Sequence, residues 1–274
     1  MKKILKLFAL LFCLFAVSAC KADDTLVVYT EAGFAPFEYI SEGKIVGVDV
    51  DIMNLVGEKL GKKVRFENVN FDVIVDTVAA GKLTKVGAAG LSITEERMQK
   101  VDFSKVYYQA NLYVIYDISK EASLKHLMSD GNYGVYWSSL MTDKGIGVQT
   151  GTTADLFLSD EVKDGGLLEG VKVNFFSSLD TAVSDIGLNS DFVIIDELPA
   201  RKLVEGKANL NCLPLYYQGE AGDELAFDEY AICVTKGETE LLAAINEVLD
   251  ELLQEDENGL TGIQALVNKH LGLD

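Results

Sequence analysis

The stretch VGAAGLSITEERMQ, residues 86–99, changes from an apolar run to a polar helix start within a few residues. Its first part, Val86 to Leu91, has the continuous apolar character of a buried strand, and a polar turn leads into a predicted helix at Thr94 to Gln99. Thr94 is suited to cap this helix, and the two glutamates that follow lie where a helix dipole favours acids. A strand followed directly by a helix is the building unit of α/β proteins.

The same alternation continues on both sides of this stretch. It predicts an α/β protein with mostly parallel sheets covered by helices on both faces, in which ligands gather at the carboxyl ends of the strands. The predicted strands are residues 25–30, 63–69, 86–91, 146–149, 172–176, 191–196 and 231–235, and the predicted helices are 49–60, 72–80, 94–99, 153–162, 179–188, 197–205, 238–255 and 261–271.

Two such units are visible, one before about residue 112 and one after about residue 145. The aromatic run Tyr107 to Tyr116 joins them, and no Pro- or Gly-rich linker separates them. We therefore expect two lobes connected by strands that pass through a hinge. Residues 119–144 are placed only as part of the second lobe.

The composition is that of a globular protein, with 274 residues, 49% hydrophobic side chains and a formal net charge of -19. Nucleic acid is excluded as a partner because no cluster of lysines and arginines is present to bind phosphates. No spacing indicates a catalytic centre, a cofactor or a metal site. The isolated His126 and His270 are expected at the surface.

The N-terminus predicts export. Three lysines precede the apolar run Leu7 to Val17, which is too short to span a bilayer, so residues 1–19 are expected to be a signal peptide. Residues 17–20, Val-Ser-Ala-Cys, resemble the lipobox of bacterial lipoproteins, which implies an acylated Cys20, residues 20–24 as a tether, and a membrane-anchored protein facing the periplasm or the cell exterior. The alternative is plain export with an incidental cysteine.

Two further cysteines, Cys212 and Cys233, lie in apolar strand-like runs. In an oxidising compartment they can pair, or both can remain buried thiols, and the sequence leaves both alternatives open.

Three strand ends carry polar side chains that can bind a small charged molecule. Arg97 is one of only three arginines, and a guanidinium beside free backbone N–H groups suits a carboxylate, although a solvated helix arginine is the simpler alternative. Gln149 to Thr153 ends a strand and opens a helix, where N–H groups and hydroxyls can bind an anion or only cap the helix. Asp196 ends the apolar run Phe192 to Ile195 and can accept from an ammonium or cap the next helix.

Aromatic residues supply a fourth element. Phe34 follows the first strand and Phe71 opens a later helix, so they can form an apolar clamp or belong to the core.

Taken in order, five motifs resemble the polar amino-acid substrate-binding proteins of bacterial ABC transporters, over essentially all of residues 25–274. This family implies a type II periplasmic-binding fold, in which two α/β lobes joined by two crossing strands close around an α-amino acid. It implies a monomer with residues 25–112 and 222–274 in lobe 1, residues 113–221 in lobe 2, and delivery of the amino acid to an ABC transporter permease. The motifs are FAPFE (34–38), GVDVD (47–51), SITEER (92–97), VDFS (101–104) and QTGTT (149–153).

The resemblance also implies a role for each candidate residue. The ligand carboxylate is assigned to Arg97, to backbone near Thr94, and to Thr152 and Thr153. The ligand ammonium is assigned to the Gly90 carbonyl, the Ser92 hydroxyl and Asp196. Phe34 and Phe71 are expected to enclose the side chain, with Gln149 and Ile195 as further walls.

The chain departs from the family pattern at Gly81-Lys82-Leu83-Thr84-Lys85, which is one residue longer than usual and has Lys85 near the place of an acid. This change is expected behind the pocket. A same-fold enzyme, a dehydratase or a murein-cleaving enzyme with Glu38 or Glu197 as acid, is the main alternative function, and an amino-acid sensor that docks onto a receptor is another.

Overall fold

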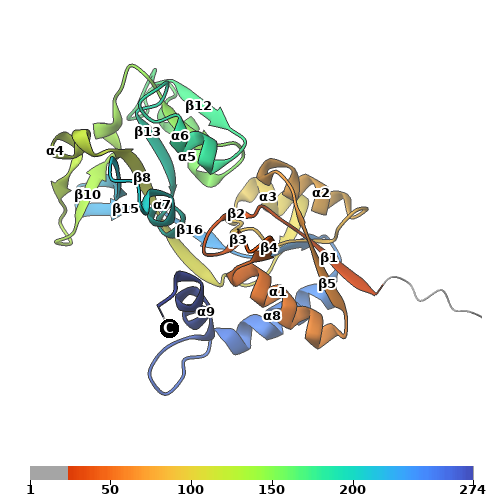
Figure 1. The fold of residues 1–274 in the computed structure, drawn as a ribbon. Helices are drawn as coiled ribbons and strands as arrows, with labels where there is room; N and C mark the ends of the chain where they lie inside the picture. Colours follow the sequence, from red (N-terminus) through yellow and green to blue (C-terminus); the bar gives the residue numbers. More distant parts are fainter. Residues whose placement is uncertain (1–23, 274) are drawn as a thin grey trace, which may run out of the picture.

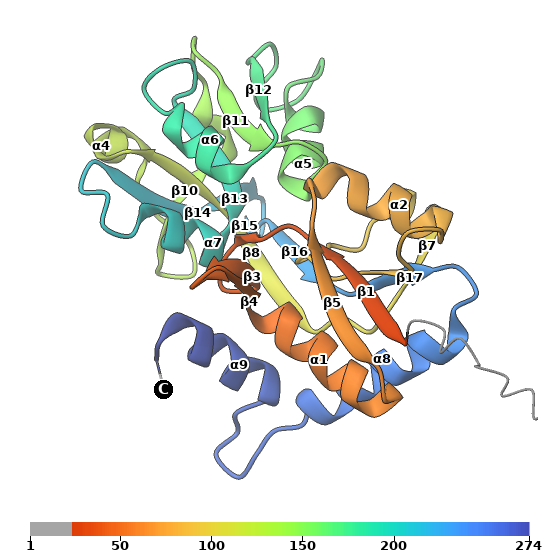
Figure 2. The same cartoon turned by 45° about the vertical axis from the view of Figure 1, so that its right-hand side comes forward.

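The computed structural model describes residues 24–273, which form two lobes joined by extended segments (Figures 1 and 2). The predicted signal peptide, Cys20 and the tether before Asp24 lie outside the described residues. Within residues 24–273, no helix combines the length and the apolar character needed to cross a membrane.

The first lobe is built on a five-stranded sheet with the order β5-β1-β6-β17-β7. Its first three strands are parallel, because helices return the chain to the same edge each time, while β17 runs antiparallel to both of its neighbours. The strands are β1 (Thr25–Thr30), β5 (Lys63–Asn68), β6 (Val86–Gly87), β7 (Val101–Phe103) and β17 (Cys233–Thr235); a small separate sheet consists of β2 (Gly33–Phe34), β3 (Glu38–Ser41) and β4 (Lys44–Val46).

Helices cover both faces of this sheet, as predicted. One face packs on α1, α8 and α9, where Ile52, Met53 and Ile245 are fully buried, and the other packs on α2, where Ile74 and Val78 are. The helices are α1 (Val48–Leu60), α2 (Ile74–Ala80), α3 (Glu95–Lys100), α8 (Thr239–Leu252) and α9 (Gly262–Leu271), with a short 3-10 turn η1 (Phe71–Val73) before α2.

The second lobe contains a nine-stranded mixed sheet with the main order β12-β11-β13-β8-β14-β10-β9, in which β12, β11 and β13 form a parallel unit. The strands are β8 (Tyr108–Asp117), β9 (His126–Leu127), β10 (Tyr133–Tyr136), β11 (Ile146–Gln149), β12 (Val173–Phe176), β13 (Phe192–Asp196), β14 (Leu210–Gly219), β15 (Gly222–Leu225) and β16 (Phe227–Tyr230). Because β15 pairs with β14, this sheet extends past the lobe boundary expected at residue 221.

The helices of the second lobe flank its parallel unit and include α5, α6 and α7 (Figure 2). Residues 119–144, which the sequence placed only by lobe, form short elements at the β10 end of the sheet, where Trp137 is fully buried. The helical segments are α4 (Glu121–Leu124), α5 (Thr153–Glu161), α6 (Leu179–Ser184), α7 (Glu197–Val204), η2 (Ile118–Lys120) and η3 (Trp137–Leu140).

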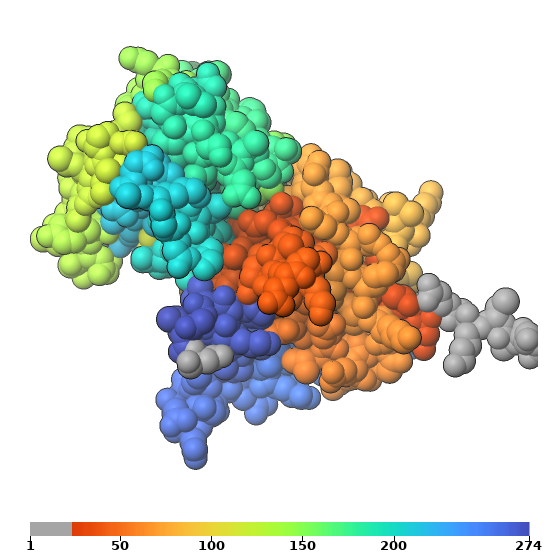
Figure 3. Space-filling view, viewed as in Figure 1, coloured from red at the N-terminus to blue at the C-terminus, as the bar shows by residue number. Residues whose placement is uncertain are grey.

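Two antiparallel strands carry the chain between the lobes. β8 leaves the first lobe and becomes a central strand of the second, while β16 returns alongside it, with Phe227 opposite Asn111 and Tyr230 opposite Tyr108. The surfaces of the two lobes touch beside these strands (Figure 3). Polar groups near the hinge are therefore within reach of both lobes.

Two local outcomes differ from the prediction and one agrees with it. The strand predicted at 86–91 ends at Gly87, because the chain turns through a positive φ of 53° at Gly90. The prediction for His270 is wrong: its side chain is buried, 3.2 Å from the Tyr39 hydroxyl and 2.9 Å from Asp51. His126 is exposed, as predicted.

The two cysteines of the described chain are free and buried. Cys212 lies in β14 of the second lobe and Cys233 in β17 of the first. Of the two alternatives for these cysteines, the structure has two separate buried thiols and no disulfide between them.

Candidate functional site

The turn after β6 is the first part of the site. A Cβ atom at Gly90 would lie only 2.7 Å from Cε1 of Phe34, so close packing as well as the positive φ requires glycine here. Thr94 caps α3 by accepting from the Arg97 N–H at 3.2 Å, as the sequence predicted. The cap fixes the first turn of α3, from which the Arg97 side chain projects.

Arg97 is buried at the junction of the lobes. Its Nη1 donates to the Ser92 carbonyl at 2.5 Å, and its Nη2 donates to the Gly151 carbonyl of the second lobe at 2.8 Å. The guanidinium carbon lies 5.6 Å from the centre of the Phe71 ring. Burial lowers the pKa of Arg97, while Asp228 acts in the opposite direction, and arginine remains charged in proteins. The alternative of a solvated helix arginine is therefore wrong.

The second lobe contributes the end of β11 and the start of α5. Thr152 caps α5 and also donates from its hydroxyl to the Gln149 carbonyl at 2.8 Å. The Thr153 hydroxyl lies 3.3 Å from the Ser92 hydroxyl of the first lobe. Gln149 is buried and donates to the Ser177 carbonyl at 3.2 Å. The structure thus brings the two predicted motifs, 92–97 and 149–153, into direct contact.

Asp196 lies at the carboxyl end of β13, directly after the fully buried Ile195. Although Asp196 occupies the N-cap position of α7, its side chain makes no capping hydrogen bond, and within the described chain its Oδ1 has no hydrogen-bond partner. Burial raises the pKa of Asp196 well above its usual range, and the neighbouring Asp228 raises it further, while Arg97 lowers it. A buried carboxylate that is not used for capping can serve a cationic ligand group.

Asp228 on the hinge strand β16 is a site residue that sequence reasoning missed. It accepts a short hydrogen bond from the Thr153 hydroxyl, and it lies close enough to Arg97 for each to influence the pKa of the other. Along β16 the buried positions are Asp228 and Tyr230, whereas Phe227 and Glu229 are exposed. The exposed member of this alternation is the apolar Phe227 and the buried one is the acid Asp228, the reverse of what hydrophobicity alone would favour.

Phe34 and Phe71 both lie near residues 90–97, but they contact different residues there. Phe34 is buried against Gly90, Phe37 and Tyr230, with ring centres 5.9 Å and 6.1 Å from the latter two. Phe71, which is only partly buried, contacts Arg97. Phe34 therefore combines a place in the core with a place next to the site.

Glu31 was also missed by sequence reasoning. It follows β1 and faces Gln149 and Asp180 of the opposite lobe. Burial raises the pKa of Glu31, the Gln149 side chain lowers it by hydrogen bonding, and Asp180 raises it. Its position directly after a strand was the available signal.

Neither of the two acids considered for the alternative enzyme function is available as a free acid in this site. Glu38 is fully buried beside Asp49, and Glu197 accepts from Nε of Arg201 at 2.9 Å. Within residues 24–273, no cluster of histidine, cysteine and carboxylate side chains is arranged to hold a metal ion.

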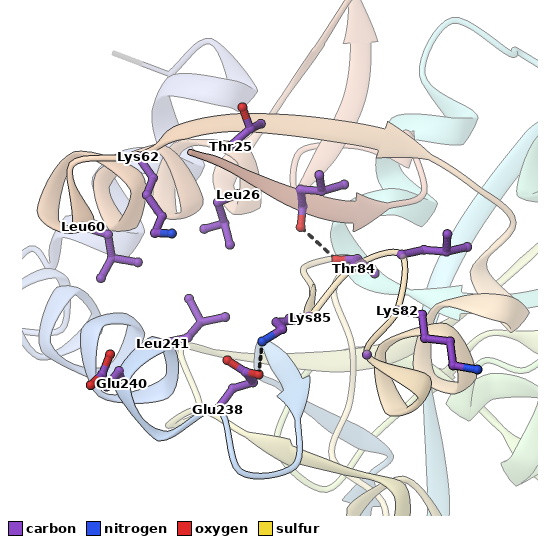
Figure 4. A pocket seen from close by; sticks show the side chains of 13 residues that line it. Thr25, Leu26, Leu60, Lys62, Lys82, Thr84, Lys85, Glu238, Glu240 and Leu241 are labelled. Carbon is purple, nitrogen blue, oxygen red and sulfur yellow. Dashed lines mark hydrogen bonds and ion pairs between the residues drawn. The ribbon is translucent and has the colours of Figure 1, made fainter. Parts of the chain in front are cut away.

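A cavity of about 410 Å³ lies away from the cleft, on the first lobe (Figure 4). It contains the departure from the family pattern at residues 81–85, where Lys85 forms an ion pair with Glu238 and Thr84 donates to the Val27 carbonyl at 2.8 Å. None of the predicted ligand residues lines it. The departure from the family pattern therefore lies away from the predicted site.

The sequence matches the bacterial extracellular solute-binding proteins, family 3, over residues 26–270. The chain belongs to this family. The family 3 protein is 26% identical to the arginine-binding extracellular protein ArtP of Bacillus subtilis, with 94% of each chain covered. It is also 26% identical to the L-cystine-binding protein TcyJ of Escherichia coli K12, over 93% of this chain and 85% of TcyJ.

Solved structures agree with this assignment. The amino acid ABC transporter substrate-binding protein AbpA from Streptococcus pneumoniae, bound to L-arginine, matches this family 3 protein with a TM-score of 0.75 and 25% identity, covering 94% of this chain and 98% of AbpA. The predicted two-lobed type II periplasmic-binding fold is confirmed. The relatives are named as binding proteins, and they differ in the amino acid that they are named for.

Proposed function

We propose that this protein captures an α-amino acid with a cationic side chain between its lobes and delivers it to an ABC transporter permease. The observation that carries the proposal is the position of Arg97, a buried cation of the first lobe whose guanidinium reaches the second lobe and faces the carboxylates of Asp196 and Asp228. Charges of both signs on facing surfaces complement a zwitterion.

The ligand carboxylate is assigned to Arg97 and the second-lobe residues Thr152 and Thr153. Arg97 already donates to two backbone carbonyls, and a ligand carboxylate is a stronger acceptor than either because it is charged. The start of α5 adds backbone N–H groups and a favourable dipole.

The ligand ammonium is assigned to Asp196, with the Gly90 carbonyl and the Ser92 hydroxyl completing its contacts. A cation beside Asp196 stabilises the ionised carboxylate, which otherwise carries a high desolvation cost in this buried position.

A cationic side chain is favoured by the excess of carboxylates around the cleft. Asp196 and Asp228 lie near Arg97, and Glu31 faces Gln149 and Asp180 of the opposite lobe. A ligand of zero net charge leaves this excess of acids uncompensated. Phe34 and Phe71 add apolar surface, and Gln149 and Ile195 lie at the end of the second-lobe strands. Relatives named for arginine are consistent with this preference.

Anchoring and delivery complete the proposal. Acylation of Cys20 would hold the exported protein at the membrane, where a monomer that closes on ligand presents a different surface to the permease. We infer a binding protein rather than an enzyme, because a charged ligand accounts for the buried acids of the cleft, Asp196 and Asp228.

Calorimetry with a panel of arginine, lysine, ornithine, histidine, glutamine and cystine tests the ligand class. We expect the tightest binding from the first three. Tighter binding of glutamine or cystine would reject the cationic preference, and the absence of binding to any amino acid would reject the function. Labelling with a palmitate analogue, compared between the wild type and Cys20→Ser, tests the anchor separately.

A further inference from the structure

Two carboxyl groups lie side by side in the first lobe beneath the Gly90 turn. Asp49 is in the first turn of α1 and Glu38 is the first residue of β3. The backbone brings them together, because the Asp49 N–H donates to the Phe37 carbonyl at 3.0 Å and Gly47 packs directly against residues 37 and 38. Glu38 is 0% exposed and Asp49 is 1% exposed, so bulk water does not solvate the charge of either carboxyl group.

Asp49 connects the ligand-binding turn to the hinge. Its Oδ2 accepts from the Gly90 N–H at 3.0 Å, and its Oδ1 accepts from the Tyr107 hydroxyl at 2.5 Å. Tyr107 directly precedes the hinge strand β8, and its own N–H donates to the Tyr230 carbonyl on β16. Two donors directed at one carboxyl group favour its ionised form, which is a pure acceptor.

Glu38 is different, because both of its side-chain oxygens lack a hydrogen-bond partner among the described residues. An ionised carboxylate without partners in the interior is far too costly to persist. A protonated Glu38, in contrast, has an O–H that can be directed at the adjacent Asp49.

We propose that Glu38 and Asp49 form a carboxyl–carboxylate pair that shares one proton, in which neutral Glu38 donates to Asp49 and Asp49 positions the Gly90 turn for ligand binding. Both are positioning residues, since neither touches the ligand. This role in binding rests on the proposed function, whereas the shared proton does not.

The surroundings favour this distribution of charge. The titratable groups that face Glu38 are Asp49 on α1 and Glu31 after β1, and Tyr107 adds a hydroxyl to the Asp49 side. Burial raises the pKa of Glu38 well above its usual range, and the two acids raise it further. Burial also raises the pKa of Asp49, to about 6, although Tyr107 and Gly90 oppose the rise. Glu38 is therefore the member of the pair that keeps the proton.

The first experiment measures stability against pH and needs no ligand. Because the pKa of Glu38 is higher in the folded than in the unfolded chain, its contribution is fully present below the unfolded pKa and is lost as the pH rises through the folded pKa. Glu38→Gln keeps a donor in the same place but cannot titrate. We expect the Tm of the wild type, relative to Glu38→Gln, to fall as the pH is raised from about 5 into the alkaline range. A constant difference across this range would overturn the shared proton.

Glu58→Gln is the matched control, because Glu58 is an exposed carboxylate on the same helix α1. Its Tm should follow the wild type at every pH.

The second experiment measures amino-acid affinity at neutral pH. Asn at position 49 offers one oxygen to two donors, so Asp49→Asn should weaken binding by about 5- to 100-fold. Adding Tyr107→Phe removes one of those donors and should restore part of the affinity. Glu38→Gln should bind within about threefold of the wild type, since its amide can still donate. Wild-type affinity in Asp49→Asn, or no recovery in the double variant, would overturn the positioning role.

The outcomes separate the two proposals. If the wild type binds no amino acid, the proposed function fails, while the dependence of Tm on pH still decides whether the proton is shared. If Asp49→Asn does not fold, the pH profile of Glu38→Gln and its affinity remain as tests.

Discussion

The two halves of the site have the same construction and opposite charge. In the first lobe, the turn after β6 leads to Thr94, which caps α3, and in the second lobe β11 leads to Thr152, which caps α5. The first half contributes the cation Arg97, and the second contributes the anion Asp196 at the end of β13. In the proposed assignment, the charged partner of the ligand carboxylate and that of the ligand ammonium therefore lie in different lobes. If this assignment holds, the full set of contacts requires both lobes to meet, and binding is then coupled to closure.

The hinge adds a third contribution that belongs to neither half. Asp228 on β16 accepts from the Thr153 hydroxyl and faces Arg97, so it interacts with groups of both lobes. Removing each charge in turn tests whether the two halves contribute to ligand binding as proposed.

The largest effect is expected from removing the cation. Arg97→Ala should weaken amino-acid binding by about 2–5 kcal/mol, because the ligand carboxylate loses its charged partner in a buried site. Titration calorimetry measures the change. Arg97→Lys should recover only part of the loss, since lysine cannot reproduce the two parallel contacts of a guanidinium.

Arg201→Ala is the matched control for this variant. The Arg201 side chain is largely exposed and pairs with Glu197 and Tyr113, neither of which is a predicted ligand residue. Equal losses in Arg97→Ala and Arg201→Ala would mean that charge in general, and not a specific contact, controls binding.

A smaller effect is expected from removing the anion. Asp196→Asn should weaken binding of α-amino acids by about 1.5–3 kcal/mol, the usual range for a hydrogen bond to a charged group. The affinity for the same ligands without their amino group should change little. Competition binding with both series measures the difference, and an equal loss in the two series would remove Asp196 from the ammonium site.

The sequence was sufficient for the parts of the fold that depend on local pattern. Helix α1 and strand β11 were predicted to within a residue, because apolar periodicity and the flanking glycines determine them locally. The secondary structure of residues 119–144 could not be predicted from the sequence. Its elements are four residues or shorter and are stabilised by contacts distant in sequence, such as Trp137 against Tyr217.

The same limit applies to the site. Arg97 and Asp196 follow strands in the order of the chain, and the carboxyl ends of strands meet in this type of fold, so their convergence could be expected. Asp228 and Glu31 could not be selected in this way. Their importance depends on how closely the lobes approach each other, which is a property of the hinge and not of any local segment.

The smallest and most specific effect is expected from Asp228→Asn, because two opposing changes occur. The Thr153 hydroxyl keeps an oxygen acceptor of lower charge, which should cost about 0.5–1.5 kcal/mol of binding near neutral pH. Asp228 also raises the pKa of Asp196, so its removal lowers that pKa. The ligand ammonium requires an ionised Asp196, and binding of the wild type should therefore weaken as the pH falls through the raised pKa of Asp196.

In Asp228→Asn this weakening should begin at lower pH, so that the affinity curves of the wild type and the variant approach or cross in acid. Calorimetry between about pH 5 and about pH 8 tests this, with the exposed neighbour Glu229→Gln as the control. Parallel curves for the wild type and Asp228→Asn would show that the hinge acid does not act on the second half of the site.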